Sequence, residues 1–326
     1  MTLGQKSFSR SLKILHDLPH DAGLAFLLPG QGAQKVGMGL EAYKSSPAAR
    51  SVFESADDVL EAVISRLCFR GPEEELTRTV NAQPAILVTS LAILAAALDS
   101  GAIDRRPAFL AGHSLGEYTA LVIAGSLEFD DCLRLVRERG RLMEMAGTQT
   151  PGTMAAIVGL SAEEVRELCA VSGACECNFN ARTQIVVGGA PEAVERACAL
   201  AREGGGRGLP MKVAGAFHTP LMETAAESFK IALNEIAPAD LAIPVIGNAS
   251  AQPLQTGAEV IAELGRQMAT PVLWYQSVLS LIESGITRFL ELGPGRTLTT
   301  MLKRDSAQLT LLSLDSDPIA AGAPHV

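Results

Sequence analysis

Long apolar runs are missing from this sequence of 326 residues. The longest, Ala85 to Leu98, is shorter than the roughly 20 residues that a membrane-spanning helix needs. The first 20 residues include Lys6, Arg10 and Lys13, but no apolar core or small-residue cleavage site of a secretion signal follows them. We therefore expect no membrane contact. We also expect residues 1–20 to form a loosely held N-terminal extension, with a mitochondrial transit peptide as the alternative.

Positive charge is also scarce, because 27 Lys and Arg against 36 Asp and Glu leave a formal net charge of −9. This balance argues against a broad surface for nucleic acid or for an anionic membrane. The six cysteines lack the spacing of a zinc site, since Cys175 and Cys177 are only two positions apart. Most lie in apolar stretches, where a thiol acts as a small apolar side chain. We expect no metal, no resident cofactor and a reducing, cytoplasmic environment.

What the sequence does contain is an alternation of strand-like and helix-like segments, with 48% apolar residues to fill a core. Short apolar runs at Leu24–Leu28 and Phe109–Ala111 are typical of strands buried on both faces. Strands that alternate with helices predict an α/β fold with a parallel sheet covered on both sides. We assign this large domain to residues 21–150 and 217–314, followed by a flexible tail over 315–326.

The stretch from Thr153 to Val213 has a different order of elements. It predicts strands and helices at Thr153–Val158, Ser161–Ala170, Cys175–Asn178, Gln184–Val187, Pro191–Arg202 and Leu209–Val213. Ser161 and Glu164 have the spacing of a capping box, and three glycines precede the last strand. The order strand, helix, strand, strand, helix, strand is that of the ferredoxin-like unit. We predict that residues 151–216 form this small domain, inserted into the large one.

Ser114 lies at the centre of Gly112-His113-Ser114-Leu115-Gly116, directly after a predicted strand. A Gly-x-Ser-x-Gly turn between a strand and a helix presents the hydroxyl at the edge of the sheet. The unpaired N–H groups at the start of the helix place a partial positive charge at the same point. This context predicts a nucleophile, with a plain turn serine as the alternative.

A serine nucleophile needs a base, and histidine is the usual one. Of the five histidines, His16, His20 and His325 lie in terminal segments that we place outside the fold. The side chain of His113 should point away from that of its neighbour Ser114. His218, in the segment Gly215–Pro220, remains as the candidate base, with a structural loop histidine as the alternative.

A helix predicted over Phe129–Ala146 places Arg139 in the middle of its apolar face, opposite the solvated side that carries Arg137 and Arg141. A buried guanidinium is costly without an anion, because arginine cannot lose its proton. One interpretation is an internal salt bridge to a carboxylate. The other is a clamp for the carboxylate of a dicarboxylic acyl substrate.

The glycine-rich segment Pro29–Gly37 does not match a nucleotide-binding loop. Lys35 occupies the third glycine position of G-x-G-x-x-G, and no GK[ST] sequence is present. We expect this segment to bring a hydrogen-bond donor close to the nucleophile, with the side-chain amide of Gln31 as the candidate.

These residues lie in motifs that resemble those of the malonyl-CoA:acyl carrier protein transacylases, which include the acyltransferase domains of fatty acid and polyketide synthases. The similarity runs from about Leu24 to Arg304. The motifs are PGQGAQ at Pro29, QPA at Gln83, GHSLGEY at Gly112, RG at Arg139, NFN at Asn178, GAFHTPLM at Gly215 and ELGPG at Glu291.

The resemblance implies an α/β-hydrolase-like large domain with an inserted ferredoxin-like small domain, and an acyl group carried on Ser114 with His218 as the base. It implies that a main-chain carbonyl at Gln267 orients the histidine, and that Arg139 pairs with the malonyl carboxylate. The oxyanion hole and the pocket are implied at Gln31 and Leu115 (main-chain N–H groups) and at Met143, Asn180 and Phe217, the last as a bulky residue of malonyl-selective members. Gln31 then acts through its main chain rather than its side chain.

The implied reaction is a ping-pong transfer of malonyl from malonyl-CoA to the phosphopantetheine thiol of an acyl carrier protein. Such carriers are acidic, so we expect a local basic patch, with Arg182, Lys212, Lys303 and Arg304 as candidates. Three alternatives stay open: an acyl-thioester hydrolase, a methylmalonyl-selective acyltransferase of polyketide synthesis, and a non-catalytic subunit of a larger synthase.

Overall fold

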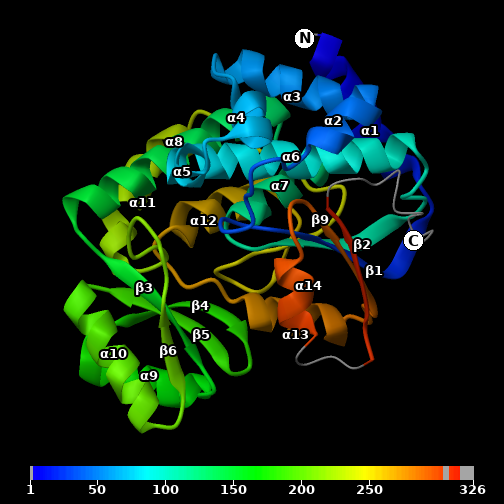
Figure 1. Cartoon of the computed structure of the whole chain (residues 1–326). Coiled ribbons are helices and arrows are strands. Elements are labelled where there is room, and N and C mark those ends of the chain that lie inside the picture. The colour runs from blue at the N-terminus through cyan, green and yellow to red at the C-terminus, as the bar shows by residue number, and fades with distance from the viewer. Residues whose placement is uncertain (1–2, 304–307, 316–326) are drawn as a thin grey trace.

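The computed structural model of the protein describes residues 3–303 and 308–315, with side chains from residue 10 onward. It has two lobes, each built on its own sheet (Figure 1). The larger sheet has, in spatial order, β10 (Thr310–Leu314), β9 (Arg288–Leu292), β1 (His20–Leu28), β2 (Arg106–Gly112), β7 (Val245–Ile246) and β8 (Pro253–Leu254).

Neighbouring strands of the larger sheet are parallel, except that β8 runs antiparallel to β7. The sheet is therefore mixed, whereas the sequence led us to expect only parallel strands. The reason is the short connection between β7 and β8, since a parallel pair needs a crossover of a dozen or more residues.

Helices cover both faces of this sheet, as the buried pattern of β1 requires. Leu24, Phe26 and Leu28 belong to one apolar core, and the alternating Ala25 and Leu27 belong to another. The first core is shared with α1 (Leu3–Asp17), α2 (Leu40–Ser45), α3 (Pro47–Leu60), α4 (Ile64–Arg70), α5 (Glu73–Thr77), α6 (Thr79–Asp99), α7 (Leu115–Ile123), α8 (Phe129–Gln149), α11 (Glu223–Leu233) and α12 (Gly257–Gln267). The second core is shared with α13 (Trp274–Glu283) and α14 (Thr297–Leu302), on the opposite side of the sheet in Figure 1.

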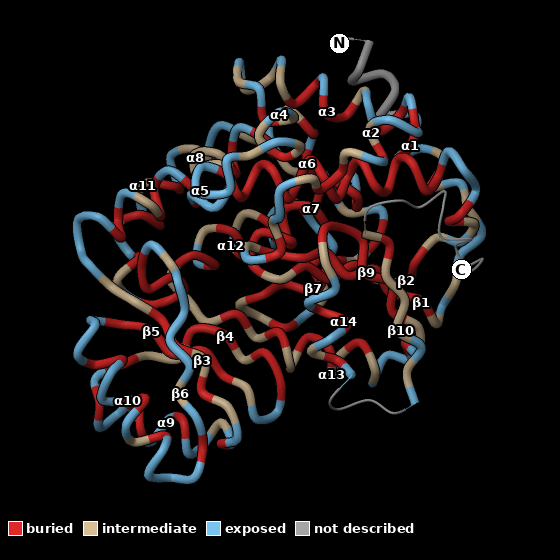
Figure 2. The backbone as a smooth tube through the Cα atoms, in the orientation of Figure 1, coloured by how far each residue is buried: buried red, intermediate tan, exposed pale blue. Residues whose placement is uncertain are grey.

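Helix α6 has the length and hydropathy of a membrane span, which the shorter apolar run in the sequence did not indicate. However, 89% of its most apolar 18-residue window is buried inside the protein. Figure 2 shows it as a buried helix beneath α3. Its apolar surface is therefore covered by its own fold, as in a core helix.

The smaller lobe has a four-stranded antiparallel sheet in the order β4 (Cys175–Ala181), β5 (Gln184–Gly189), β3 (Thr153–Val158) and β6 (Arg207–Pro210). Helices α9 (Ala162–Ser172) and α10 (Pro191–Glu203) pack with its strands in a separate apolar core. Ser161 and Glu164 form the expected capping box at the start of α9.

The last strand of this lobe was predicted wrongly as Leu209–Val213. In the structure β6 is Arg207–Pro210, and its residues pair with Val158 to Ala155 of β3. The glycines that precede it bring the chain back to β3 earlier than the apolar pattern suggests. Pro210 lacks an N–H group and is accommodated because β6 is an edge strand.

The prediction that residues 1–20 are a loosely held extension is also wrong for the described part. Helix α1 ends at Asp17, Leu15 is completely buried, and β1 already begins at His20. The ring of His16 lies 2.9 Å from the main-chain oxygen of Ile123 at the end of α7. The apolar side of α1 is thus part of the large core. The flexible tail predicted over 315–326 lies outside the described residues except for Asp315, which pairs with Lys35 at 2.7 Å.

Replacing Leu15 by Ala should lower the free energy of unfolding by about 2–4 kcal/mol, because it leaves a cavity in the core. The exposed Lys13 on the same helix provides the control, since Lys13→Ala should change stability by no more than about 0.5 kcal/mol. Urea unfolding measures both. Equal stability of the two variants would show that α1 does not contribute to the core.

Candidate active site

The nucleophile turn joins the end of β2 to the start of α7, and Ser114 stands between them with a φ of 52°. This left-handed conformation is strained for a serine and is held by the surrounding structure. The two flanking glycines, Gly112 and Gly116, allow the backbone of the turn to pack closely against itself and against the end of β1. A Cβ atom at Gly112 would lie 1.9 Å from the carbonyl carbon of Gly116, and one at Gly116 would lie 2.0 Å from the main-chain oxygen of Leu28. Any side chain at either position would push the turn open.

His218 lies next to this serine. Its Nε2 is 2.7 Å from Ser114 Oγ, and its Nδ1 is 2.9 Å from the main-chain oxygen of Gln267. The Gln267 carbonyl can only accept, so Nδ1 carries the proton and Nε2 is free to accept one from the serine. This is the geometry of a serine and its general base, oriented by a carbonyl instead of a carboxylate.

The base is held in its neutral form. Burial, and after it the positive charge of Arg139, lower the pKa of His218 to about 3. A neutral imidazole is the form that can take the hydroxyl proton, so the site is poised for proton abstraction at neutral pH.

Arg139 is buried in the same site, with 1% of its surface exposed. Its Nη1 donates to the side-chain oxygen of Gln83 at 2.8 Å, and its Nη2 donates to Ser114 Oγ at 3.1 Å and to Gln267 Oε1 at 2.8 Å. Its carbon Cζ lies 5.2 Å from the centre of the Tyr118 ring.

These partners of Arg139 are all neutral. Among the side chains described, those of residues 10–303 and 308–315, no carboxylate forms an ion pair with Arg139, and its Nε has no hydrogen-bond partner. The internal salt bridge considered from the sequence is therefore absent from the described part of the chain. A buried positive charge without a counter-ion, 3.1 Å from the nucleophile, suits an anionic substrate group.

Gln267 connects these residues from the last position of α12. Its side-chain Nε2 donates to the main-chain oxygen of Ser114 and to Oε2 of Glu117, both at 3.0 Å. Asn248, after β7, accepts a hydrogen bond from the Ser114 N–H at 2.6 Å and donates to the oxygen of Gly112 at 2.7 Å. The nucleophile turn is thus fastened to two distant segments of the chain.

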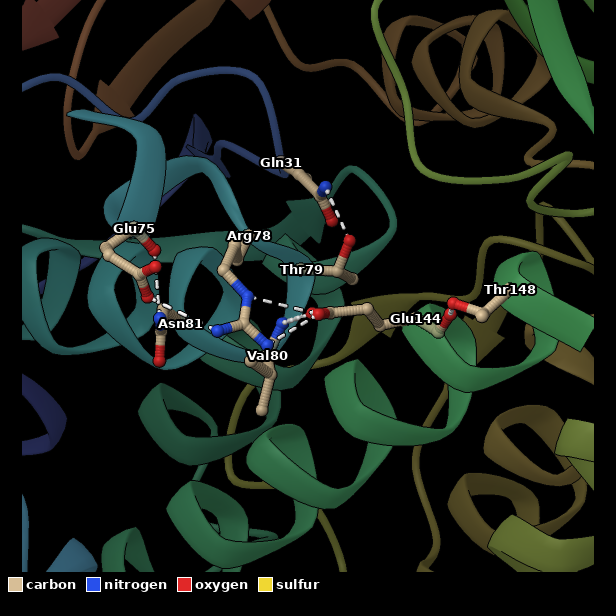
Figure 3. A network of polar contacts seen from close by, with 8 residues as sticks. All are labelled: Gln31, Glu75, Arg78, Thr79, Val80, Asn81, Glu144 and Thr148. Carbon is tan, nitrogen blue, oxygen red and sulfur yellow. Dashed lines mark hydrogen bonds and ion pairs between the residues drawn. The ribbon is translucent and has the colours of Figure 1, made fainter.

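The loop after β1 packs against the same turn, because a Cβ atom at Gly30 would lie 2.3 Å from the main-chain oxygen of His113. The side chain of Gln31 points away to Thr79, 3.3 Å from its hydroxyl (Figure 3). The main-chain N–H groups of Gln31 and Leu115 have no acceptor in the described part of the chain. These two main-chain N–H groups can therefore donate to an oxyanion, whereas the Gln31 side-chain amide is directed at Thr79.

Figure 3 also shows how the start of α6 is attached to α8. Arg78 and the Val80 N–H both bond the carboxylate of Glu144, at 2.8 Å from Arg78 Nη2 and 3.3 Å from the main chain. Because α6 carries Gln83 and α8 carries Arg139, this contact keeps the guanidinium and its acceptor in register.

The three predicted pocket residues, Met143, Asn180 and Phe217, lie at different places around Ser114, His218 and Arg139. Met143 accepts a hydrogen bond from Gln83 Nε2 at 3.2 Å, beside Arg139. Asn180, at the end of β4, lies 2.8 Å from His113 Nε2. Phe217 is buried in the large core, and its ring is 3.4 Å from the position of a Cβ atom at Gly215.

The prediction that His16 and His20 lie outside the fold is wrong. His16 and His20 belong to the fold, in α1 and β1, and were not outside it. They lie near the amino end of β1, at the edge of the sheet opposite to the carboxyl ends of β1 and β2, where Ser114 is found. The choice of His218 is therefore unaffected.

Gln83, Glu117 and Asn248 were not identified as functional from the sequence. Gln83 and Glu117 stand inside the motifs at Gln83 and Gly112, which was the available signal. Asn248 is a single polar residue in a loop and has no local signal. Over the described residues, no three His, Cys, Asp or Glu side chains are grouped to hold a metal ion.

Known proteins resemble this chain in both sequence and structure. The family described as "Acyl transferase domain" matches residues 25–318. A malonyl CoA-acyl carrier protein transacylase of Bacillus subtilis (strain 168) is 43% identical over 303 residues, which cover 90% of this chain and 94% of the relative. The crystal structure of a malonyl-CoA:acyl carrier protein transacylase from Xanthomonas oryzae aligns with a TM-score of 0.88 at 39% identity, over 93% of this chain and 98% of the other.

A further solved structure shows a malonyl-transacylase in complex with a type II PKS acyl-carrier protein, and it aligns with a TM-score of 0.87 at 36% identity, over 90% of this chain and 96% of the other. The matches span nearly the whole of both partners and include the segments that form the site above. The chain therefore belongs to the acyl transferase family and, within it, to the malonyl-CoA:acyl carrier protein transacylases.

Proposed function

We propose that this protein transfers the malonyl group of malonyl-CoA to the phosphopantetheine thiol of an acyl carrier protein, through a malonyl ester on Ser114. The observation that carries the proposal is the buried, unpaired Arg139 beside a serine–histidine pair. This arginine would favour an acyl group that carries a free carboxylate, such as malonyl. The named relatives are malonyl transacylases, and one was solved with its carrier protein.

In the first half-reaction, the malonyl carboxylate binds Arg139 and places the thioester carbonyl over Ser114. His218 takes the hydroxyl proton as the oxygen attacks that carbonyl. The oxyanion accepts hydrogen bonds from the N–H groups of Gln31 and Leu115, and loss of one such donor typically costs about 3 kcal/mol. The carbon–sulfur bond then breaks, and His218 returns its proton to the CoA thiolate.

In the second half-reaction, the carrier thiol repeats these steps in reverse order. His218 takes the thiol proton, the sulfur attacks the ester carbonyl, and Ser114 leaves with the proton from the histidine. Carriers of fatty acid and polyketide synthesis present the same phosphopantetheine thiol, so this scheme serves both. Met143, Asn180 and Phe217 are proposed to line the acyl pocket, Phe217 as the bulky residue that disfavours an α-methyl branch.

The architecture supports a finer assignment of the fold. The smaller sheet, with two helices on one face and the strand order β4-β5-β3-β6, suits a ferredoxin-like unit. The larger sheet, with Ser114 at the turn after β2, suits an α/β-hydrolase-like domain. A Cβ atom at Gly147 would lie 2.0 Å from the oxygen of Ala214, so the last turn of α8 lies against the segment that returns from the smaller lobe, as expected for an insertion of residues 151–216.

Carrier docking is proposed at exposed basic side chains. Arg182, Lys212 and Lys303 are exposed, whereas Arg304 lies outside the described residues. All six cysteines are free thiols, which supports a reducing, cytoplasmic location.

Incubation with malonyl-CoA should give the intact protein one malonyl adduct on Ser114, and Ser114→Ala should show none. Mass spectrometry of the intact chain and its peptides measures this. Addition of carrier protein should remove the adduct and load the carrier. Rapid release of free malonate without carrier would instead identify a hydrolase, and no adduct at all would indicate a non-catalytic subunit.

The acid side of the pH profile of kcat/KM for malonyl-CoA should stay flat from pH 8 to pH 5. The pKa of His218 is lowered to about 3, so the neutral base persists over this range. A histidine with the usual pKa of about 6.5 would lose about tenfold by pH 5.5. Initial acylation rates at constant ionic strength distinguish the two, and a midpoint near 6.5 would contradict the geometry described for His218.

Arg139→Ala should lower kcat/KM for malonyl-CoA by about 30- to 1000-fold, since a charged hydrogen-bonded pair is worth roughly 2–4 kcal/mol at a buried site. Acylation by acetyl-CoA, which has no carboxylate, should change far less. Arg141→Ala is the matched control, because Arg141 lies exposed on the same helix and pairs with Glu138 at 2.7 Å. A variant that keeps its malonyl preference would argue against the clamp.

A further inference from the structure

Glu117 is a buried carboxylic acid that the reaction scheme does not use. It lies in the first turn of α7, three residues after the nucleophile, and is completely buried. Its Oε2 accepts hydrogen bonds from the main-chain N–H of Asn248 and from the side-chain nitrogen of Gln267, both at 3.0 Å. Its other oxygen, Oε1, has no partner in the described part of the chain. Burial of a carboxylic acid costs free energy unless hydrogen bonds compensate it, and here only one of its two oxygens has partners.

The Gln267 amide has one orientation that satisfies its surroundings. Its oxygen faces Arg139 Nη2 at 2.8 Å, and a guanidinium can only donate. Its nitrogen faces the main-chain oxygen of Ser114 and Oε2 of Glu117, both at 3.0 Å, where an acceptor is required. The acceptor at Glu117 and the main-chain oxygen of Ser114 therefore both favour the orientation that offers an oxygen to the guanidinium, and Glu117 is the side chain among these two acceptors.

The same acceptor is also linked to the nucleophile turn. Asn248, its second partner, holds the N–H of Ser114 at 2.6 Å and the oxygen of Gly112 at 2.7 Å. Gln267, its first partner, holds the base through its main-chain carbonyl, 2.9 Å from His218 Nδ1. Glu117 thus contacts both residues that align the site, without touching Ser114 Oγ, His218 or Arg139 through a hydrogen bond.

We propose that Glu117 is a positioning residue for acyl selection: through its Oε2 it holds the Gln267 amide, whose oxygen keeps the guanidinium of Arg139 over Ser114. The inference rests on the proposed function, because the guanidinium is assigned there to the malonyl carboxylate. Burial, and after it the nearby Glu263, raise the pKa of Glu117 to about 8. The protonated, neutral carboxyl group therefore predominates at neutral pH, and its carbonyl oxygen can still accept a hydrogen bond.

Glu117→Ala should lower kcat/KM for malonyl-CoA by about 10- to 100-fold, because a displacement of about 1 Å in a positioning group has costs of this size. Acetyl-CoA should be affected much less, so the ratio of malonyl to acetyl acylation should fall. Glu117→Gln keeps an oxygen acceptor and should hold that ratio within about threefold of wild type. In an Arg139→Ala background, adding Glu117→Ala should leave the ratio unchanged, since the two residues act on one step.

Glu291→Ala is the matched control. It removes another fully buried carboxylate, which accepts from the N–H groups of Leu298 and Thr299 at 3.1 and 2.8 Å, and it should lower the melting temperature without changing the ratio. Should Glu117→Ala not fold, Gln267→Leu, which keeps the main-chain carbonyl, should show the same fall. An equal loss with both acyl donors, or an unchanged ratio, would overturn the inference. A wild-type protein that fails to transfer malonyl would instead refute the proposed function.

Discussion

A permanent positive charge is buried next to the nucleophile, and the described structure surrounds it with neutral acceptors only. Arg139 donates to Gln83, Gln267 and Ser114, and these hydrogen bonds orient the guanidinium without neutralising it. Removal of an ion from water costs several kcal/mol unless an opposite charge compensates it. In the proposed function, the carboxylate of the substrate supplies the missing charge. After burial, the same positive charge also lowers the pKa of His218 and so helps to keep its imidazole neutral.

The rest of the site keeps three groups from separate parts of the chain in contact. Ser114 is presented by a strained turn that closes only because Gly112 and Gly116 have no side chains. Gln267 contacts both His218 and Arg139, because its main-chain oxygen orients the imidazole and its amide oxygen restrains the guanidinium. One residue at the end of α12 therefore contacts both the histidine and the guanidinium to which we assign base and substrate-binding roles. This arrangement replaces the acidic third member of a serine triad by a carbonyl that carries no charge.

Local sequence patterns were sufficient to predict the turn at Ser114 and the burial of Arg139. The glycine–serine turn after an apolar strand predicted the nucleophile, and helical periodicity alone placed Arg139 on the buried face of α8. The network around Gln267 could not be predicted in this way, because its hydrogen bonds join residues such as Glu117 and Gln267 that are 150 positions apart. The errors have the same origin: docking of α1 onto the core and the register of β6 against β3 both depend on distant partners.

The most direct test of this account is a crystal structure of the acylated protein, trapped as the malonyl ester of Ser114. The account predicts that the free carboxylate lies within hydrogen-bonding distance of the Arg139 guanidinium, with the ester oxygen directed at the N–H groups of Gln31 and Leu115. A carboxylate that points to solvent, with Arg139 still bound only to its neutral acceptors, would contradict it.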